Sequence, residues 1–337
     1  MKRRKFAQTI AKAGLAPAFL PLSSSSNYHR RPKQIKPSAL KSGDTVGLVT
    51  PASSIRPEQL ERAKSNIEKM GFQFKIGNHA SDQNGFLAGL DYQRVADLHD
   101  MLKDDKVKAL WCIRGGYGMT RILSEIDTRL LIKYPKLIIG YSDITALHNL
   151  TSLHGLTSVH GQVAGATFTD EVMANMRDTI SGNLSNKVIR PSATEESYTI
   201  FEGRAKGHLT GGNLSLLASM AGTPFLDSFK NKIVFIEDIG EKPYRIDRML
   251  TQLIQSTDLK KAAGIALGNF ADCEKDDDDK SWTLKEVLFD RLRSLEIPTC
   301  YGFPFGHVKR NLVMPMHCKV ELDASSIQLT YKEEVVV

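Results

Sequence analysis

Ser142 is the side chain whose local sequence best suits a nucleophile. The apolar run Leu137-Ile138-Ile139 predicts a buried strand ending at Gly140, and from Asp143 onward apolar residues recur at helical spacing. A serine on a tight turn between a strand and a helix is the arrangement of a nucleophile elbow, which exposes the hydroxyl to a substrate. The same position suits a serine that only caps the helix. This stretch alone leaves both roles open.

A histidine and a glutamate could complete a serine-based site. His307 ends the Gly/Pro-rich segment Gly302-Phe303-Pro304-Phe305-Gly306-His307, a loop from which a base could project into a cleft. Glu237 follows the apolar strand predicted at 233–236, where a carboxylate could orient an imidazole. Glu237 could instead be a solvated residue at the strand end, or form a structural ion pair with Arg245 or Arg248. The chain order Ser, Glu, His is compatible with a catalytic triad but does not diagnose one.

A glycine-rich loop follows the apolar strand predicted at 107–113. The segment Arg114-Gly115-Gly116-Tyr117-Gly118 lacks the third glycine of a dinucleotide-binding motif, because Arg121 stands there. Glycines after a strand also let backbone N–H groups turn toward an anion, such as the oxyanion of an acyl-transfer reaction. Arg114 is a candidate contact for a substrate carboxylate, and it could equally be a structural residue at the strand end.

Other kinds of site are not supported by the residue spacing. There is no H-E-x-x-H motif, and the four cysteines are scattered without C-x-x-C spacing, which argues against a zinc site. The aspartate run at 276–279 lacks the spacing of a calcium loop. Ser38-Ala39-Leu40-Lys41 matches S-x-x-K, but it precedes the first predicted strand, so we interpret it as a chance match. We expect neither a metal nor an organic cofactor.

The elements that would carry these residues indicate an α/β fold. Predicted strands at 43–49, 72–76, 107–113 and 137–139 alternate with helices, including 57–70 and 91–102. Such alternation predicts a doubly wound parallel sheet with helices on both faces. Ligands bind at the carboxyl ends of the strands in such sheets, so the glycine loop and Ser142 should share one rim.

The second half of the chain is less regular than the first. We divide the chain into 1–42 (export signal and linker), 43–182 (α/β domain), 183–200 (linker) and 201–331 (C-terminal domain). Gly211-Gly212-Asn213 should open an apolar helix, with Asn213 either facing the cleft or capping that helix. Further elements are expected as strands at 232–236 and 263–267, helices at 244–254 and 284–295, and a hairpin at 318–331.

The charge of the chain is concentrated near its N-terminus. Residues 1–42 contain ten Lys and Arg and no Asp or Glu, so subtracting them from the net charge of +7 leaves −3 for the rest. A slightly acidic body has no electrostatic footprint for nucleic acid. Lys2-Arg3-Arg4-Lys5-Phe6, followed by a short apolar segment, resembles a twin-arginine export signal. No stretch is apolar enough to span a membrane.

Together these residues resemble the LD-carboxypeptidases, serine peptidases that include muramoyltetrapeptide carboxypeptidase and the microcin C self-immunity proteins. The resemblance covers about residues 40–325. The matching motifs are Gly43-Asp44-Thr45-Val46, Ala88-Gly89, Arg114-Gly115-Gly116-Tyr117-Gly118, Gly140-Tyr141-Ser142-Asp143-Ile144-Thr145, His160-Gly161, Gly211-Gly212-Asn213-Leu214, Phe235-Ile236-Glu237-Asp238, Tyr244-Arg245-Ile246-Asp247-Arg248 and Phe305-Gly306-His307.

The resemblance implies a role for each matching residue. Ser142 would be the nucleophile, His307 the general base and Glu237 the residue that orients it. The N–H groups of Asp143 and Gly116 would form the oxyanion hole. The resemblance also implies that the C-terminal domain is smaller and β-rich. The family implies a cofactor-free homodimer that releases the terminal D-alanine of muropeptide tetrapeptides. The export signal departs from the family pattern, since many members work in the cytoplasm.

Two other functions stay open at this stage. One is a microcin C-type amidase acting on peptidyl or aminoacyl nucleotides, which needs an aromatic surface such as Trp282 for the base. The other is a non-catalytic wall-binding module with a decayed site, against which the intact Ser142, Glu237 and His307 argue.

Overall fold

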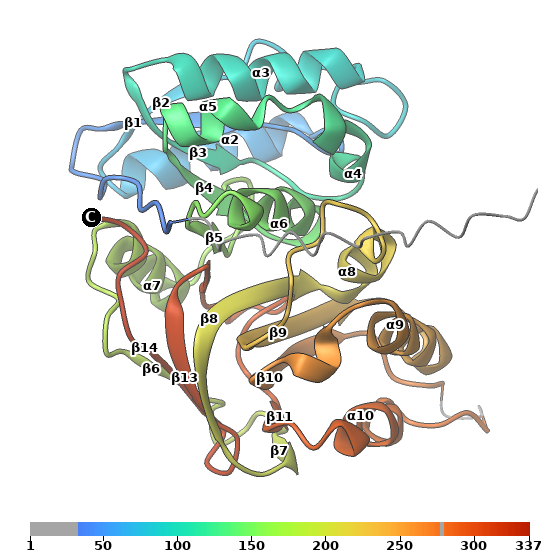
Figure 1. Ribbon diagram of the computed structural model, residues 1–337. Coiled ribbons are helices and arrows are strands. Elements are labelled where there is room, and N and C mark those ends of the chain that lie inside the picture. The colour runs from blue at the N-terminus through green and yellow to red at the C-terminus, as the bar shows by residue number, and fades with distance from the viewer. Residues whose placement is uncertain (1–32, 277–279) are drawn as a thin grey trace, which may run out of the picture. The chain divides into compact units, whose positions relative to one another are not determined.

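The computed structural model describes residues 33–276 and 280–337, and these residues form one compact unit. The predicted export signal lies almost wholly outside the described residues. Within them, two sheets organise the chain (Figure 1).

The first sheet has the order β12-β5-β4-β3-β1-β2. All its pairings are parallel except that of β12, which runs antiparallel to β5. Its strands are β1 (Thr45–Val49), β2 (Gln73–Ile76), β3 (Val107–Cys112), β4 (Leu137–Gly140), β5 (Ser158–His160) and β12 (Met314–Met316). Its helices are α2 (Pro57–Lys69), α3 (Asp91–Lys103), α4 (Met119–Ile122), α5 (Thr128–Lys133), α6 (Thr145–Leu153) and α7 (Asp170–Ile180).

Alternate side chains of the central strands enter two different cores. On β3, Leu110 and Cys112 pack with the apolar residues of α3 and α6. Ala109 and Trp111, which point the other way, pack with residues of α2 and α7. This alternation follows from the period of two in a strand, and it places helices on both faces. The predicted doubly wound sheet is confirmed.

The second sheet has the order β6-β14-β13-β8-β9-β10-β11-β7. The four central strands, β8 to β11, pair in parallel. The remaining pairings, β11–β7, β8–β13, β13–β14 and β14–β6, are antiparallel. The strands are β6 (Val188–Ile189), β7 (Tyr198–Phe201), β8 (Arg204–Asn213), β9 (Lys232–Ile239), β10 (Gly264–Ala271), β11 (Thr299–Tyr301), β13 (Lys319–Asp323) and β14 (Gln328–Tyr331). The helices α8 (Leu214–Met220), α9 (Pro243–Ser256) and α10 (Leu284–Leu292) pack on one face.

In the second half of the chain, the structure corrects the predicted start of one helix and confirms the predicted hairpin. Residues 211–213 do not begin the helix but end β8, a strand that the sequence did not indicate because glycines and charged residues are poor strand formers. The glycines are needed there because a Cβ on Gly211 would lie 1.9 Å from the carbonyl oxygen of Phe235 on β9. The predicted hairpin is confirmed as β13 and β14.

Segments far apart in sequence meet at the end of the chain. The Ala39 N–H donates to the Val337 carbonyl at 2.7 Å, and the Val337 N–H donates to the Pro37 carbonyl at 2.9 Å. Figure 1 accordingly shows the C-terminus beside the start of the coloured chain. No helix in the described part of the chain is long and apolar enough to cross a bilayer. The division into two domains with a linker at 183–200 stays a prediction.

Candidate active site

The turn after β4 holds Ser142 in a conformation that L-amino acids rarely adopt. Ser142 has a φ of 62°, in the left-handed region, which costs a non-glycine residue on the order of 1–2 kcal/mol. A 3₁₀ turn at Ser142–Ile144 follows, and α6 then begins at Thr145 without a side-chain cap. A serine that served only as a cap would not need this backbone strain, which is typical of functional sites. The geometry therefore favours the nucleophile elbow.

The glycine loop after β3 packs against this turn. A Cβ on Gly115 would lie 3.0 Å from the Tyr141 carbonyl oxygen and 3.3 Å from the Asp143 nitrogen, so any larger residue would crowd the backbone of the serine turn. Gly116 has a φ of 103°, and a Cβ there would lie 2.5 Å from the Ser53 hydroxyl. The backbone donors expected at Gly116 and Asp143 thus come from two segments in direct contact.

His307 is held by Glu237, which ends the apolar part of β9. The His307 Nδ1 and the Glu237 Oε2 are 2.7 Å apart, and the Glu237 side chain is fully buried. Gly306 permits this approach, since a Cβ there would lie 2.8 Å from the same carboxylate oxygen. Glu237 therefore does not pair with Arg245, whose partner is Glu241 at 3.3 Å.

Opposing influences set the pKa of His307. Burial alone would lower it, because a charged imidazole is poorly solvated there. The hydrogen bond and the negative charge of Glu237, with a contribution from Asp238, outweigh burial and raise the pKa above its ordinary value. Glu237 thus stabilises the protonated imidazole that a general base becomes when it accepts a proton.

One cavity of about 460 Å³ brings the two halves of the candidate site together. Ser142, His307, Arg114 and Gly116 all line it. Its other lining residues are Gln59, Arg62, Gly115, Tyr141, Val163, Gly165, Ala166 and Thr167. The ring of Tyr141 packs against that of His307, with centroids 4.9 Å apart.

Arg114 and Asn213 differ in how well they could meet a substrate. Arg114 lines the cavity, while its Nη1 donates to the Ser54 carbonyl at 2.7 Å. Asn213 is buried, its Oδ1 accepts from the Leu216 N–H and its Nδ2 donates to Asp238 at 2.9 Å. Asn213 therefore caps α8, and the cavity lining does not include it.

The sequence analysis did not identify six of the lining residues, of which Gln59 and Arg62 have long polar side chains. Gln59 and Arg62 lie in the first two turns of α2, three positions apart and hence on one helix face. The helix follows β1 at the carboxyl edge of the sheet, where ligands bind. That position is the signal that could have identified them.

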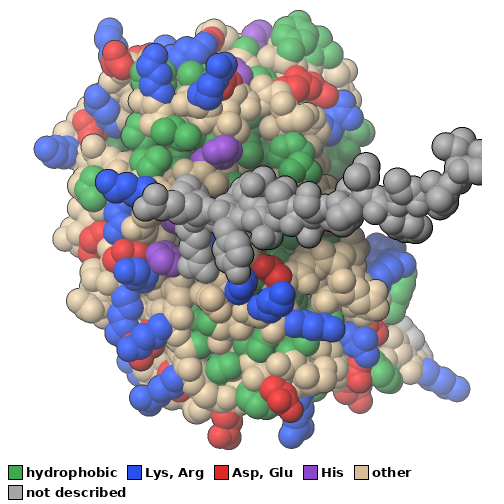
Figure 2. Space-filling model, in the orientation of Figure 1, with side chains coloured by type: hydrophobic (Ala, Val, Ile, Leu, Met, Phe, Trp, Pro, Cys, Tyr) green, Lys and Arg blue, Asp and Glu red, His purple; other side chains and the backbone are tan. Residues whose placement is uncertain are grey.

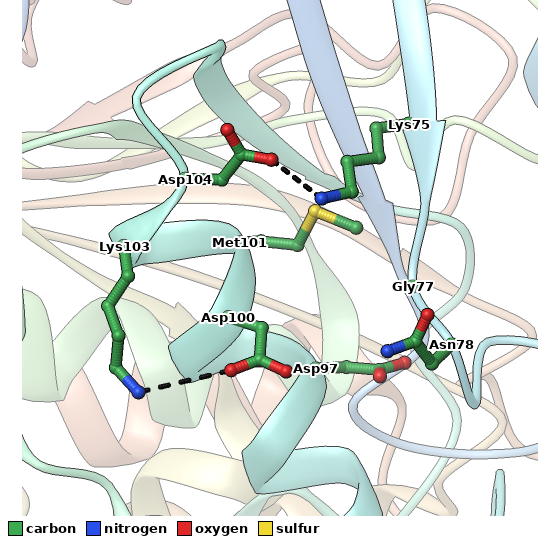
Figure 3. A pocket seen from close by; sticks show the side chains of 8 residues that line it. All are labelled: Lys75, Gly77, Asn78, Asp97, Asp100, Met101, Lys103 and Asp104. Carbon is green, nitrogen blue, oxygen red and sulfur yellow. Dashed lines mark hydrogen bonds and ion pairs between the residues drawn. The ribbon is translucent and has the colours of Figure 1, made fainter.

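A second cavity, of about 320 Å³, lies between β2 and α3 (Figure 3). Two of its aspartates pair with lysines, with Lys75 2.6 Å from Asp104 and Lys103 3.9 Å from Asp100, and the third, Asp97, accepts from the His79 N–H. All of the predicted site residues lie elsewhere. The described residues include no cluster of His, Cys, Asp and Glu that could hold a metal. Lys and Arg side chains lie among Asp and Glu side chains on the face shown in Figure 2.

Comparisons with known proteins agree with this arrangement. Residues 46–161 match the family model described as LD-carboxypeptidase N-terminal domain, and residues 206–322 match LD-carboxypeptidase C-terminal domain. A "Probable murein peptide carboxypeptidase" of Bacillus subtilis is 40% identical over 298 residues, 86% of this chain and 92% of the relative. The chain belongs to the LD-carboxypeptidase family.

Solved structures add the fold. A muramoyltetrapeptide carboxypeptidase from Oxalobacter formigenes matches with a TM-score of 0.76 and 29% identity, covering 86% of this chain and 99% of that one. The microcin C7 self-immunity protein MccF, solved with aspartyl sulfamoyl adenosine, matches with a TM-score of 0.80 and 21% identity, covering 90% of this chain and 100% of that one. The second likeness shows a shared fold. The family makes this protein a hydrolase, a serine carboxypeptidase, which sets aside the non-catalytic wall-binding module.

Proposed function

We propose that this LD-carboxypeptidase releases the terminal D-alanine from murein tetrapeptides through an acyl-enzyme. One observation carries the proposal: the strained Ser142 and the Glu237-bound His307 line a single cavity. The names of the Bacillus and Oxalobacter relatives point to murein peptides as the substrate.

The three residues of the proposed triad have different roles in the reaction, and His307 acts in two of its steps. His307 removes the Ser142 proton as the hydroxyl attacks the carbonyl before D-alanine, because a neutral serine is a weak nucleophile. Glu237 keeps the imidazole in the right tautomer and stabilises its charged form. The N–H groups of Gly116 and Asp143 bind the tetrahedral oxyanion. His307 then protonates the departing amine, and water hydrolyses the acyl-enzyme.

A carboxypeptidase must also bind the free carboxylate of its substrate. Arg114 and Arg62 are the two arginines among the described residues that line the cavity, and an arginine can bind a carboxylate with two parallel hydrogen bonds. We assign this contact to Arg114. Arg114→Met should raise KM by roughly ten- to a hundredfold, the value of one or two charged hydrogen bonds, with little change in kcat.

The proposed function is tested by mass spectrometry of muropeptides. The protein should shorten a tetrapeptide by one D-alanine, and Ser142→Ala should abolish this while leaving the circular dichroism spectrum unchanged. Ser219→Ala, an exposed serine on α8, is the matched control and should keep full activity. Full activity in Ser142→Ala would refute the assignment of the nucleophile.

A microcin C-type amidase remains the second candidate, suggested by the shared fold with MccF. Trp282, the aromatic side chain proposed to stack on a base, is 51% exposed but lies outside the cavity lining. The carboxypeptidase is therefore the better-supported proposal. Incubation with an aminoacyl sulfamoyl adenosine separates the two, because only an amidase of this type would cleave it.

We also propose that the protein is exported and acts as a homodimer. The first proposal rests on the sequence of residues 1–42, and replacing Arg3 and Arg4 by Lys should block export in a fractionation assay. If the doubly substituted protein reached the periplasm, the signal would not be of the twin-arginine type. The dimer rests on the family resemblance, and sedimentation equilibrium measures it directly.

A further inference from the structure

The glycine loop is held by side chains from three other parts of the fold. Ser53, after β1, accepts a hydrogen bond from the Tyr117 N–H at 3.0 Å. Arg94, on α3, donates from Nη1 to the Gly118 carbonyl at 2.9 Å. Asp143, beside the predicted nucleophile, accepts from the Met119 N–H through Oδ2 at 2.7 Å. The loop is thus tied to the sheet, to a helix and to the serine turn.

Two of these contacts meet at the same peptide group. The Gly118 carbonyl and the Met119 N–H belong to one peptide bond, which is planar and rigid. The guanidinium of Arg94 lies at its oxygen and the carboxylate of Asp143 at its nitrogen, so a cation and an anion flank one peptide dipole. Hydrogen bonds to charged groups are roughly twice as strong as neutral ones. The peptide is therefore held from both ends.

Both charged side chains are removed from water, so their contacts must offset a desolvation cost. Arg94 and Asp143 are each 1% exposed. Arg94 is further fixed by donating to the Pro51 carbonyl at 2.6 Å and to Asp91. Burying a charge costs several kcal/mol unless hydrogen bonds compensate, so both groups depend on the backbone partners they hold.

Asp143 links this contact to the predicted oxyanion hole. Its own N–H is one proposed donor, and the loop that its carboxylate holds carries the other, at Gly116. A loop with glycines at 115, 116 and 118 has little conformational preference of its own. Oxyanion donors act only when they lie about 2.7–3.1 Å from the developing charge, so the loop needs external support.

We propose that Arg94 and Asp143 are positioning residues that clamp the Gly118–Met119 peptide from both ends and so fix the spacing of the Gly116 and Asp143 N–H donors. The inference rests on the proposed function. It predicts that the clamp affects the transition state, in which the oxyanion exists, far more than the bound substrate.

Steady-state kinetics on a murein tetrapeptide test the clamp. Asp143→Ala removes the acceptor and should lower kcat by about 10²–10³-fold, the usual value of one oxyanion donor, with KM within about twofold. Asp143→Asn keeps a neutral acceptor of the same shape and should recover part of this loss. Arg94→Gln should likewise lower kcat and leave KM unchanged.

Combining the variants shows whether the two residues act on one peptide. In the double variant Arg94→Gln/Asp143→Asn, the fold-decrease in kcat should be smaller than the product of the two single fold-decreases. Once one substitution has freed the Gly118–Met119 peptide, the second has little further effect on its position. Arg121→Gln is the matched control, since the guanidinium of Arg121 also pairs with Asp91, at 2.7 Å, but is exposed at the surface. It should keep the wild-type kcat.

The outcomes separate the clamp from the proposed function. If the wild-type protein releases no D-alanine, the function fails and the clamp fails with it. If the wild type is active and folded Asp143→Asn and Arg94→Gln both keep wild-type kcat, only the clamp is refuted. Fully multiplicative losses, or losses that appear in KM, would also refute it. Should Asp143→Ala not fold, the two conservative variants decide alone.

Discussion

At the scale of single residues, the hydrogen bond between His307 and Glu237 should control when the proposed base is available. His307 accepts a proton only while it is neutral, and Glu237 raises its pKa by favouring the charged form. Activity should therefore rise with pH through a midpoint above that of an ordinary imidazole. Glu237 therefore makes the protein less active in acid, and it stabilises the imidazolium that forms during the reaction.

The substitution Glu237→Gln tests this balance. Once the carboxylate charge is removed, burial still lowers the pKa of His307, and the negative charge of Asp238 is the main influence left that raises it. The acid limb of the kcat/KM profile should move to lower pH, while the plateau falls by on the order of 10²–10⁴-fold because the imidazole loses its orienting partner. A pH series of initial rates measures both effects. Glu241→Gln, a nearby carboxylate paired with Arg245, should change neither.

At the scale of elements, glycines with positive φ let separate segments approach the site. Gly306 has a φ of 108° and brings the His307 loop against the Glu237 carboxylate. Gly240, which follows β9, has a φ of 70°, but a Cβ added there would meet no atom within 4 Å. The two glycines therefore share a left-handed backbone but differ in what surrounds them.

This difference makes the pair a matched test. Gly240→Ala should lose roughly 1–2 kcal/mol of unfolding free energy, the cost of a left-handed alanine, and Gly306→Ala should lose more, because its Cβ also meets Glu237. Only Gly306→Ala should also lose activity, by about 10²-fold, because its Cβ would push the His307 loop away from Glu237. Urea unfolding and steady-state rates on the same preparations measure the two effects. Equal activities in both variants would contradict the steric argument.

At the scale of the whole molecule, a strand from the C-terminal part of the chain completes the sheet formed by the N-terminal half. Strand β12 joins the first sheet beside β5, although about 150 residues separate them in sequence. The buried Tyr331 hydroxyl, at the end of β14, donates to the Val313 carbonyl at 2.7 Å, one residue before β12. This bond ties the second sheet to the strand that enters the first.

Tyr331→Phe should therefore lower the unfolding free energy by about 1–3 kcal/mol, because a buried carbonyl loses its donor. Tyr92→Phe is the control, since Tyr92 is 65% exposed and should change stability by less than about 0.5 kcal/mol. Denaturant titration gives both values. Catalytic activity should be unchanged in each variant, and an unchanged stability for Tyr331→Phe would contradict a stabilising role for this hydrogen bond.

The sequence by itself determined the alternation of strands and helices, the strand-end positions of Ser142 and the glycine loop, and the family. Those features depend on local periodicity and motif spacing, which are visible along the chain. The strand end predicted before Glu237 was wrong, because β9 continues to Ile239. Only the tertiary structure decided that Ser142 adopts a left-handed φ, that Glu237 pairs with His307 instead of Arg245, and that Asn213 caps a helix. It also joined Arg94 and Asp143 across one peptide. The pairing of Glu237 with His307 and the contacts of Arg94 and Asp143 join distant segments, and no local pattern encodes which partner a buried charge will find.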